Sequence, residues 1–266
     1  MDSVKIGNVT ASRFLLGSNP FSGFSHQGTD RDKLMVSHYT TARIKETLYQ
    51  AEKLGITGVV ARADFHVLRL LREYWDEGGR LQWFAQTCPE LGPTELSVER
   101  AIRWGAKGCH VHGGVMDFLV HQGKADEAKR AVDMIRKAGL KAGIAGHNAR
   151  VFEWMKKNLE VDYCMCCYYN PTPREDDPEH VHGAQEKYVE AHRQAMVEMI
   201  QTIPNPVIHY KVLAAGRNDP DAALAFAAKH MRPSDMLCVG VMTKDDPNQL
   251  KQDVELFEKH WKARQG

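Results

Sequence analysis

The feature that most constrains the fold is a regular alternation of short apolar runs with amphipathic helical stretches along the whole chain. Eight runs have the length and composition of buried parallel strands. They cover residues 14–17, 58–61, 82–87, 108–112, 142–146, 163–168, 206–213 and 236–242. Between them apolar residues recur every three or four positions, as at Ile44, Leu48 and Ala51. This alternation predicts an α/β fold, a (β/α)8 TIM barrel.

The length of 266 residues agrees with this fold, because one closed α/β barrel usually takes roughly 250 residues. We therefore expect a single barrel domain over residues 1–266. Residues 2–16 form two short apolar segments joined at Gly7-Asn8, which is a hairpin signal. The sequence thus predicts an N-terminal β-hairpin that closes the bottom of the barrel.

Charge and cysteine usage limit the kinds of partner. The net charge is +1, from 35 Lys and Arg against 34 Asp and Glu, and no basic stripe suits nucleic acid. No run reaches the roughly 18 apolar residues of a membrane helix. Six scattered cysteines suggest reduced core residues. We expect a cytoplasmic protein that binds a small-molecule substrate, with no nucleic acid and no membrane as partner, and a possible homo-oligomer.

Two predicted loops, residues 19–40 and 170–183, are much longer than usual. Both follow strands, on the face where barrel enzymes carry their sites. We interpret them as lids, with Asn19 facing the pocket; an oligomer contact is the alternative. The charged residues of the second loop suit a solvated surface, and only for His180 and His182 does another role stay open.

Two histidines end neighbouring predicted strands. Alternation puts His110 and His112 on one side of their strand, and we interpret His110 as a structural residue and His112 as a functional one. His147 ends the next strand. The pair His112 and His147 could bind a divalent metal with Glu90 or Asp64 supplying oxygen, or could transfer protons without a metal.

Lys211 lies in an otherwise apolar strand, on the same side as His209. Partial burial would lower the pKa of its amine and make it a proton donor or an imine-forming nucleophile. The alternative is a structural ion pair with Asp64 or Glu90.

Further polar residues follow other strands. Arg217 and Lys244 stand where barrels often hold a phosphate, so they could bind an anionic group. Tyr169 could form a pocket wall, and the Asn170 amide could bind a hydroxyl.

The order of these signals resembles the aldo-keto reductase barrel over nearly the whole chain. The resemblance rests on Ser12-Arg13-Phe14-Leu15-Leu16-Gly17, Leu54-Gly55-Ile56-Thr57, Gly146-His147-Asn148, Tyr169-Asn170-Pro171 and Val212-Leu213-Ala214-Ala215-Gly216. It implies an NADP cofactor and a catalytic tetrad of Asp, Tyr, Lys and His.

Only His112 matches that tetrad. Ala61 or Arg62 stands near the expected Asp, Thr87 or Cys88 near the expected Lys, and no tyrosine follows the second strand. The reductase needs the tyrosine as its proton donor, so the resemblance supports the fold more than the hydride-transfer chemistry.

These observations predict an enzyme of lyase, isomerase or hydrolase type that acts on a small polar carbonyl or sugar-like substrate. The candidate catalytic residues are His112, His147, Lys211, Glu90 and Asp64, with His112 and His147 as candidate metal ligands. The candidate substrate-binding residues are Asn19, Arg62, Asn148, Tyr169, Asn170, Arg217 and Lys244. A divalent metal is the first candidate cofactor. An NADP-dependent reductase and a non-catalytic ligand-binding barrel are the alternatives.

Overall fold

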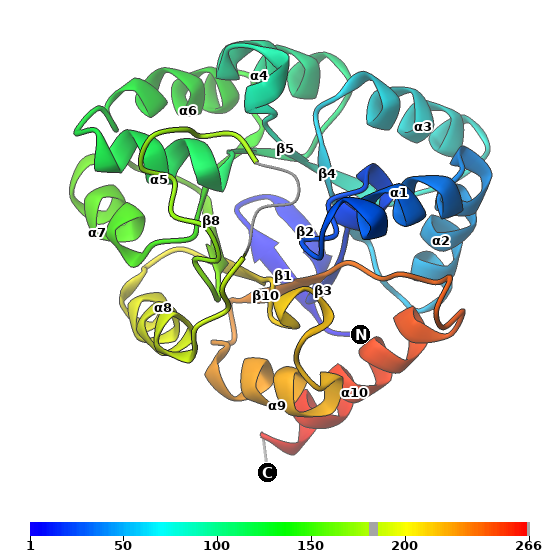
Figure 1. Cartoon of the computed structure of the whole chain (residues 1–266). Helices are drawn as coiled ribbons and strands as arrows, with labels where there is room; N and C mark the ends of the chain where they lie inside the picture. Colours follow the sequence, from blue (N-terminus) through cyan, green and yellow to red (C-terminus); the bar gives the residue numbers. More distant parts are fainter. Residues whose placement is uncertain (181–185, 265–266) are drawn as a thin grey trace.

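A closed barrel of eight parallel strands forms the centre of the molecule, and helices surround it (Figure 1). The structure is a computed structural model that describes residues 1–180 and 186–264. The barrel strands run in the order β3 to β10, and β10 closes the ring by pairing with β3. The predicted (β/α)8 fold is confirmed.

The strands of the described residues are β1 (Ser3–Ile6), β2 (Val9–Ser12), β3 (Phe14–Gly17), β4 (Gly58–Arg62), β5 (Gln82–Gln86), β6 (Gly108–Val111), β7 (Lys141–Gly146), β8 (Tyr163–Cys167), β9 (Val207–Tyr210) and β10 (Met236–Val239). The α-helices are α1 (Thr29–His38), α2 (Thr41–Lys53), α3 (Phe65–Asp76), α4 (Thr94–Arg103), α5 (Gly113–His121), α6 (Glu127–Lys137), α7 (Ala149–Asn158), α8 (Glu190–Thr202), α9 (Pro220–His230) and α10 (Gln249–Ala263). Short 3-10 helices are η1 (Asn19–Ser22), η2 (Pro89–Leu91) and η3 (Ala214–Gly216).

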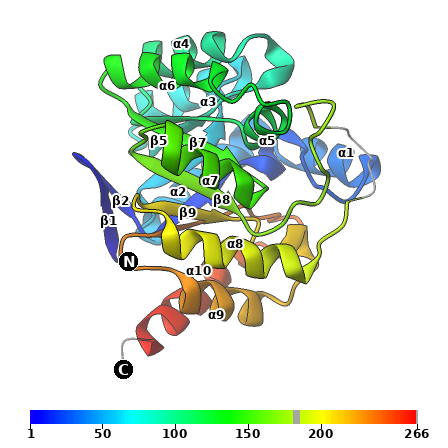
Figure 2. The same ribbon diagram turned by 90° about the vertical axis from the view of Figure 1, so that its left-hand side faces the viewer.

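The N-terminal hairpin closes one end of the barrel. β1 and β2 pair antiparallel, and Val4, Ile6 and Ala11 pack in one buried cluster with inward-facing barrel residues such as Leu15 and Phe84. Burial of these apolar side chains stabilises both parts. Figure 2 shows the hairpin at one end and α1 at the opposite end. The predicted hairpin plug is confirmed.

Strand alternation decides which side chains reach the barrel interior. On β9, Ile208 belongs to the inner cluster, whereas the buried His209 faces outward. There His209 Nδ1 lies 3.0 Å from the Tyr168 hydroxyl and His209 Nε2 lies 3.2 Å from Asp235 Oδ2. The expectation that His209 lies on the same side as Lys211, beneath the site, is therefore wrong. The strand ends at Tyr210, and Lys211 has a φ of 56°, which breaks the alternation.

The sequence pattern predicts helices that begin near Phe65, Ser97, Ala149, Gly183, Pro220 and Pro247, and the structure differs from this pattern at several points. The structure adds α1 within the first long loop and α5 directly after β6. α9 begins as expected, with Asp219 Oδ2 accepting from the Ala222 amide at 2.9 Å. The last helix, α10, begins at Gln249 instead of Pro247, because Asp246 Oδ1 accepts from the Asn248 amide at 2.8 Å in a turn before the helix. The start predicted near Gly183 lies outside the described residues, and α8 begins at Glu190.

All six cysteines are free and buried, as predicted. Among the described residues no helix is long and apolar enough to cross a membrane.

Candidate functional site

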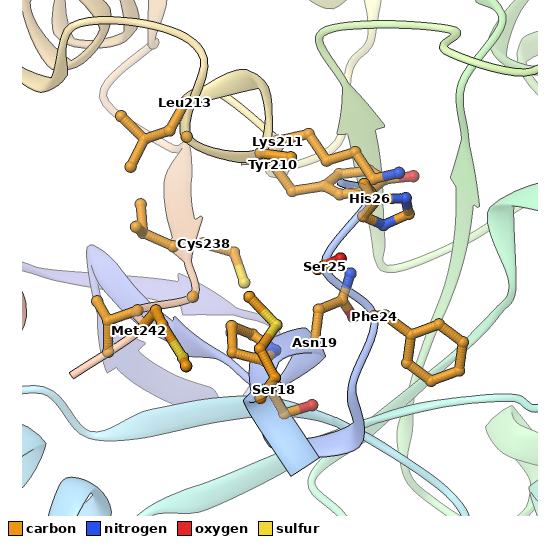
Figure 3. Close-up of a pocket in the computed structure, with 18 of the residues that line it drawn as sticks. Ser18, Asn19, Phe24, Ser25, His26, Tyr210, Lys211, Leu213, Cys238 and Met242 are labelled. Carbon is orange, nitrogen blue, oxygen red and sulfur yellow. The ribbon is translucent and has the colours of Figure 1, made fainter. Parts of the chain in front are cut away.

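Two adjoining cavities open at the end of the barrel opposite the hairpin. Their volumes are about 640 Å³ and about 220 Å³. Both are lined by Asn19, Phe24 and His26 from the first long loop, by Tyr210 at the end of β9 and by Lys211 directly after it. Figure 3 shows His26 near Lys211 and Tyr210, whereas the Phe24 ring points away from them. The prediction that the loop over residues 19–40 covers the mouth, with Asn19 facing the pocket, is confirmed.

A chain of three polar side chains joins α5, β7 and β9 at the smaller cavity. The Asp117 carboxylate accepts from His147 Nδ1 at 2.7 Å and from the backbone amide of Asn148 at 3.0 Å. His147 Nε2 lies 3.4 Å from the Tyr210 hydroxyl. Because the carboxylate requires hydrogen on Nδ1, the neutral ring presents an unprotonated Nε2 to Tyr210. This is the orienting group, base and hydroxyl arrangement of a proton relay.

Burial favours the neutral forms of the His147 imidazole and the Tyr210 phenol. It lowers the pKa of His147 despite the opposing effect of Asp117, and it raises the pKa of Tyr210 well above its ordinary value. The backbone of Gly113 packs against both rings: a Cβ there would lie 2.9 Å from His147 Cε1 and 3.0 Å from the Tyr210 hydroxyl oxygen. A glycine is therefore required for the close approach.

Lys211 lines both cavities, and its amine has no hydrogen bond or ion pair with any residue that the structure describes. Burial lowers the pKa of this amine, although Cys167 and Glu186 act in the opposite direction. The expected structural alternative, an ion pair with Asp64 or Glu90, is wrong because both carboxylates bond to Arg62 instead.

Arg62 stands at the end of β4 between those two acids. Its Nε donates to Asp64 Oδ2 at 2.9 Å, its Nη2 pairs with Glu90, and its guanidinium lies 4.7 Å from the centroid of the Phe24 ring. Arg62 lines both cavities and Glu90 the smaller one. Asp64 instead caps α3, accepting from the Val67 amide at 2.8 Å, and is not among the lining residues that the structure describes. Two carboxylates thus hold one arginine fork in place.

His112 also lines the smaller cavity. Its Nδ1 accepts from the Gly114 amide at 3.1 Å at the start of α5, and burial lowers its pKa well below the ordinary value. The deeper His110 bonds to the Tyr163 hydroxyl at 3.0 Å inside the barrel. His112 and His147 each use one ring nitrogen in a hydrogen bond, and Arg62 pairs with both Glu90 and Asp64. Among the described residues no third metal ligand lies close to the two histidines.

Five predicted substrate-binding residues lie outside both cavities, as far as the described residues show. Asn148 caps α7 through the Arg150 amide, and Tyr169 accepts from Asn218 Nδ2 at 2.8 Å. The buried Asn170 Oδ1 has no described partner. Arg217 donates to the carbonyl of His26 at 2.8 Å. Lys244 is exposed.

Sequence reasoning missed Asp117, Tyr210 and His26. Asp117 is the one acid in the otherwise apolar stretch Gly113–His121, and that isolation was a signal. Tyr210 was overlooked because the strand was expected to continue past it with its other face inward. For His26 no local pattern pointed to the cavity.

The fold and the mouth together define a (β/α)8 barrel with polar side chains gathered after the strands. Comparison with solved structures agrees with this class. A Pseudomonas aeruginosa protein assigned to the aldo-keto reductases has a TM-score of 0.63 at 18% identity, over 98% of this chain and 94% of that one. The aldo-keto reductase AKR11C1 from Bacillus halodurans has a TM-score of 0.61 at 11% identity, over 98% and 95%.

The barrel is also similar to the N-acetylmannosamine-6-phosphate 2-epimerase from Clostridium perfringens. The TM-score is 0.55 at 12% identity, over 90% of this chain and 92% of that one. No protein-family model matches the chain, and no curated protein sequence matches it. At such identities the likeness shows the fold alone, that of a divergent aldo-keto reductase-like barrel.

The residues present do not fit the phosphates of NADP, the cofactor implied by the reductase resemblance. The larger cavity lies beside the turns after β9 and β10, but Arg217 and Lys244 do not line it. Asp245 and Asp246 do, and Arg31, which also lines it, is paired with Asp245. Of the described Lys and Arg side chains that line this cavity, Lys211 alone lacks a carboxylate partner. One such cation is too little for a dinucleotide phosphate group.

Proposed function

We propose that this chain is an enzyme that moves protons on a small polar carbonyl or sugar-like substrate, as a lyase, isomerase or hydrolase. The observation that carries the proposal is the Lys211 amine, which has no hydrogen bond or ion pair to a described residue and lies beside the Asp117, His147 and Tyr210 relay, where the two cavities meet. His112, His147 and Lys211 all line the smaller cavity. A barrel that only binds a ligand would not need them to converge.

In this mechanism His147 is the base and Tyr210 the proton carrier next to the substrate. Asp117 orients the imidazole and stabilises the positive charge that forms on it. Tyr210, which its raised pKa keeps protonated, gives its proton to His147 Nε2 as its oxygen takes a proton from the substrate. Asp117 is a positioning residue, because its carboxylate accepts hydrogen bonds from the His147 ring and from the backbone amides of His147 and Asn148, and does not line the cavity.

Lys211 is the electrophile that binds the substrate oxygen. An ammonium group in a partly desolvated site interacts more strongly with developing negative charge than it would in water. Arg62, held by Asp64 and Glu90, binds a second polar group of the substrate. His112 also lines the smaller cavity, and because its Nδ1 accepts from Gly114, its neutral ring carries the hydrogen on Nε2, which can donate to the substrate.

The cavity walls support a small, partly polar substrate. The larger cavity combines apolar residues such as Met165 and Val239 with the amides of Asn19 and Gln86. Apolar walls with a few convergent polar groups are typical of pockets for small molecules.

Replacing Tyr210 with Phe tests the relay. We expect turnover of a substrate found by screening to fall by about a hundredfold to ten-thousandfold, the usual contribution of a general acid or base. The melting temperature should change little, because the phenol has only weak partners, His147 at 3.4 Å and the Cys167 thiol. Tyr163→Phe is the matched control: it should lower stability by leaving buried His110 unpaired while keeping turnover. Equal turnover losses in both variants would contradict the relay.

NADPH tests the reductase alternative. We expect that saturating NADPH leaves the melting temperature unchanged, because carboxylates line the cavity where its phosphates would lie. Ligand at a hundred times its Kd would add about 2.7 kcal/mol of stability. A clear upward shift of the melting transition would therefore favour the reductase over the proposed chemistry.

A further inference from the structure

A second polar cluster lies where the two long loops meet over the mouth of the barrel. It consists of His26 from the first loop and of His180 and Glu186 from the segment between β8 and α8. One ligating atom from each lies within 4.8 Å of the others. His26 Nδ1 is 2.7 Å from Glu186 Oε1, and His180 Nδ1 is 3.9 Å from the same oxygen. In the part of the chain that is described, these residues form the one such group of three.

We propose that His26, His180 and Glu186 bind a divalent transition-metal ion, with zinc as the first candidate. Two imidazoles and one carboxylate are a ligand set that zinc sites use, with a further position open to water or substrate. All three side chains are largely buried: their exposed fractions are 9%, 13% and 2%. The proposal does not depend on the reaction suggested above, because metal binding is measured without turnover.

The surrounding contacts favour a ligand set over a chance meeting of side chains. The Tyr188 hydroxyl donates to Glu186 Oε2 at 2.8 Å, which leaves Oε1 toward the two histidines. Hydrogen bonds of this kind orient metal-binding carboxylates. On the other loop, the carbonyl of His26 accepts from Arg217 at 2.8 Å, and His26 has the left-handed φ of 58°. His26 is thus held by a distant segment, and the Glu186 carboxylate is oriented by a residue two positions along its own segment.

Binding requires only a small rearrangement. Ligands about 2.0 to 2.1 Å from a tetrahedral zinc lie about 3.3 Å apart. The His26 to Glu186 contact of 2.7 Å must therefore lengthen slightly, and the His180 to Glu186 distance of 3.9 Å must shorten by a similar amount. The His26 and His180 ligand atoms, which lie within 4.8 Å of each other, must reach a similar separation. His26 lines both cavities and His180 the smaller one, so the open position of the ion would face the cavity.

The test is metal binding by the full-length protein after treatment with EDTA. Zn²⁺ is added and bound metal is counted by mass spectrometry, and Co²⁺ is added in parallel to read the coordination geometry from visible absorption. We expect one equivalent of either metal and a four-coordinate Co²⁺ spectrum. Failure of the wild-type protein to bind either metal stoichiometrically would overturn the proposal.

Variants separate a metal site from a simple contact between loops. Glu186→Gln keeps a hydrogen bond to His26 but removes the ligand charge, so metal binding should be lost while the melting temperature of the metal-free protein holds. Tyr188→Phe removes only the orienting bond and should weaken the affinity about tenfold to a hundredfold. His38→Gln, at a histidine bonded to Thr243 instead, should bind metal like the wild type.

The variant His112→Gln tests the other histidine pair. Unchanged metal binding by His112→Gln, together with its loss in Glu186→Gln, supports the cluster. Metal lost in His112→Gln and kept in Glu186→Gln would place the ion at His112 and His147 and overturn the assignment.

Discussion

Lys211→Met is expected to lower kcat/KM by about a thousandfold or more and to leave the melting temperature unchanged or higher. A thousandfold loss corresponds to about 4 kcal/mol of transition-state stabilisation, which suits an electrophile in a partly desolvated site. The fold should tolerate the change, since the amine has no ion pair among the described residues and methionine has a similar length. Thermal melting beside turnover of a screened substrate measures both effects.

Lys229→Met serves as the control, since this lysine is exposed on α9. It should change neither quantity. A fall of several kcal/mol in the stability of Lys211→Met would instead indicate a broken buried ion pair. Lys211 would then be a structural residue, and the proposed reaction would lose its electrophile.

Asp253→Asn is expected to stabilise the protein strongly at pH 8 and hardly at pH 4. Asp253 is 2% exposed on α10, and its Oδ2 has no hydrogen-bond partner among the described residues. Burial raises the pKa of this carboxyl from 3.8 to about 7. The folded state therefore holds the proton more tightly than the unfolded state, and stability falls as pH rises between these two values.

The amide removes that dependence. A shift of roughly three pKa units corresponds to about 4 kcal/mol at pH 8, as an upper bound. Melting temperatures of wild type and variant across this pH range measure the effect, with the exposed Glu255→Gln on the same helix as control. A stability difference between Asp253→Asn and wild type that does not vary with pH would show that Asp253 is not buried as a titrating acid.

The barrel could be predicted from the sequence because its determinants are local. A short apolar run between amphipathic helical stretches indicated a strand such as Gly58–Arg62 without knowledge of distant contacts. The hairpin was equally local, since Gly7-Asn8 joins two short strands. The prediction of β9 was wrong at its end, where the backbone conformation of a single residue departs from that of a strand. Lys211 reads as strand by composition, but its φ of 56° ends β9 and reverses which side chains face inward.

The site was harder to predict, because it depends on contacts between distant segments. His112, His147 and Lys211 were expected at the mouth, since they end or follow neighbouring strands, and all three line the smaller cavity. The sequence could not show which side chain each carboxylate would bond to. Asp64 and Glu90 were equally placed to meet Lys211 or the histidines, and only the packed structure gives both to Arg62. Asp117 reaches His147 across the gap between α5 and β7.

The left-handed backbone at Lys211 bears on the stability of the turn after β9. A left-handed conformation costs most residues about 1 to 2 kcal/mol, and glycine escapes that penalty. Glycine at position 211 would relieve this strain, as Gly216 does at a φ of 82°, but it would also remove the amine. Lys211→Gly is therefore a substitution in which stability and the proposed chemistry are expected to move in opposite directions.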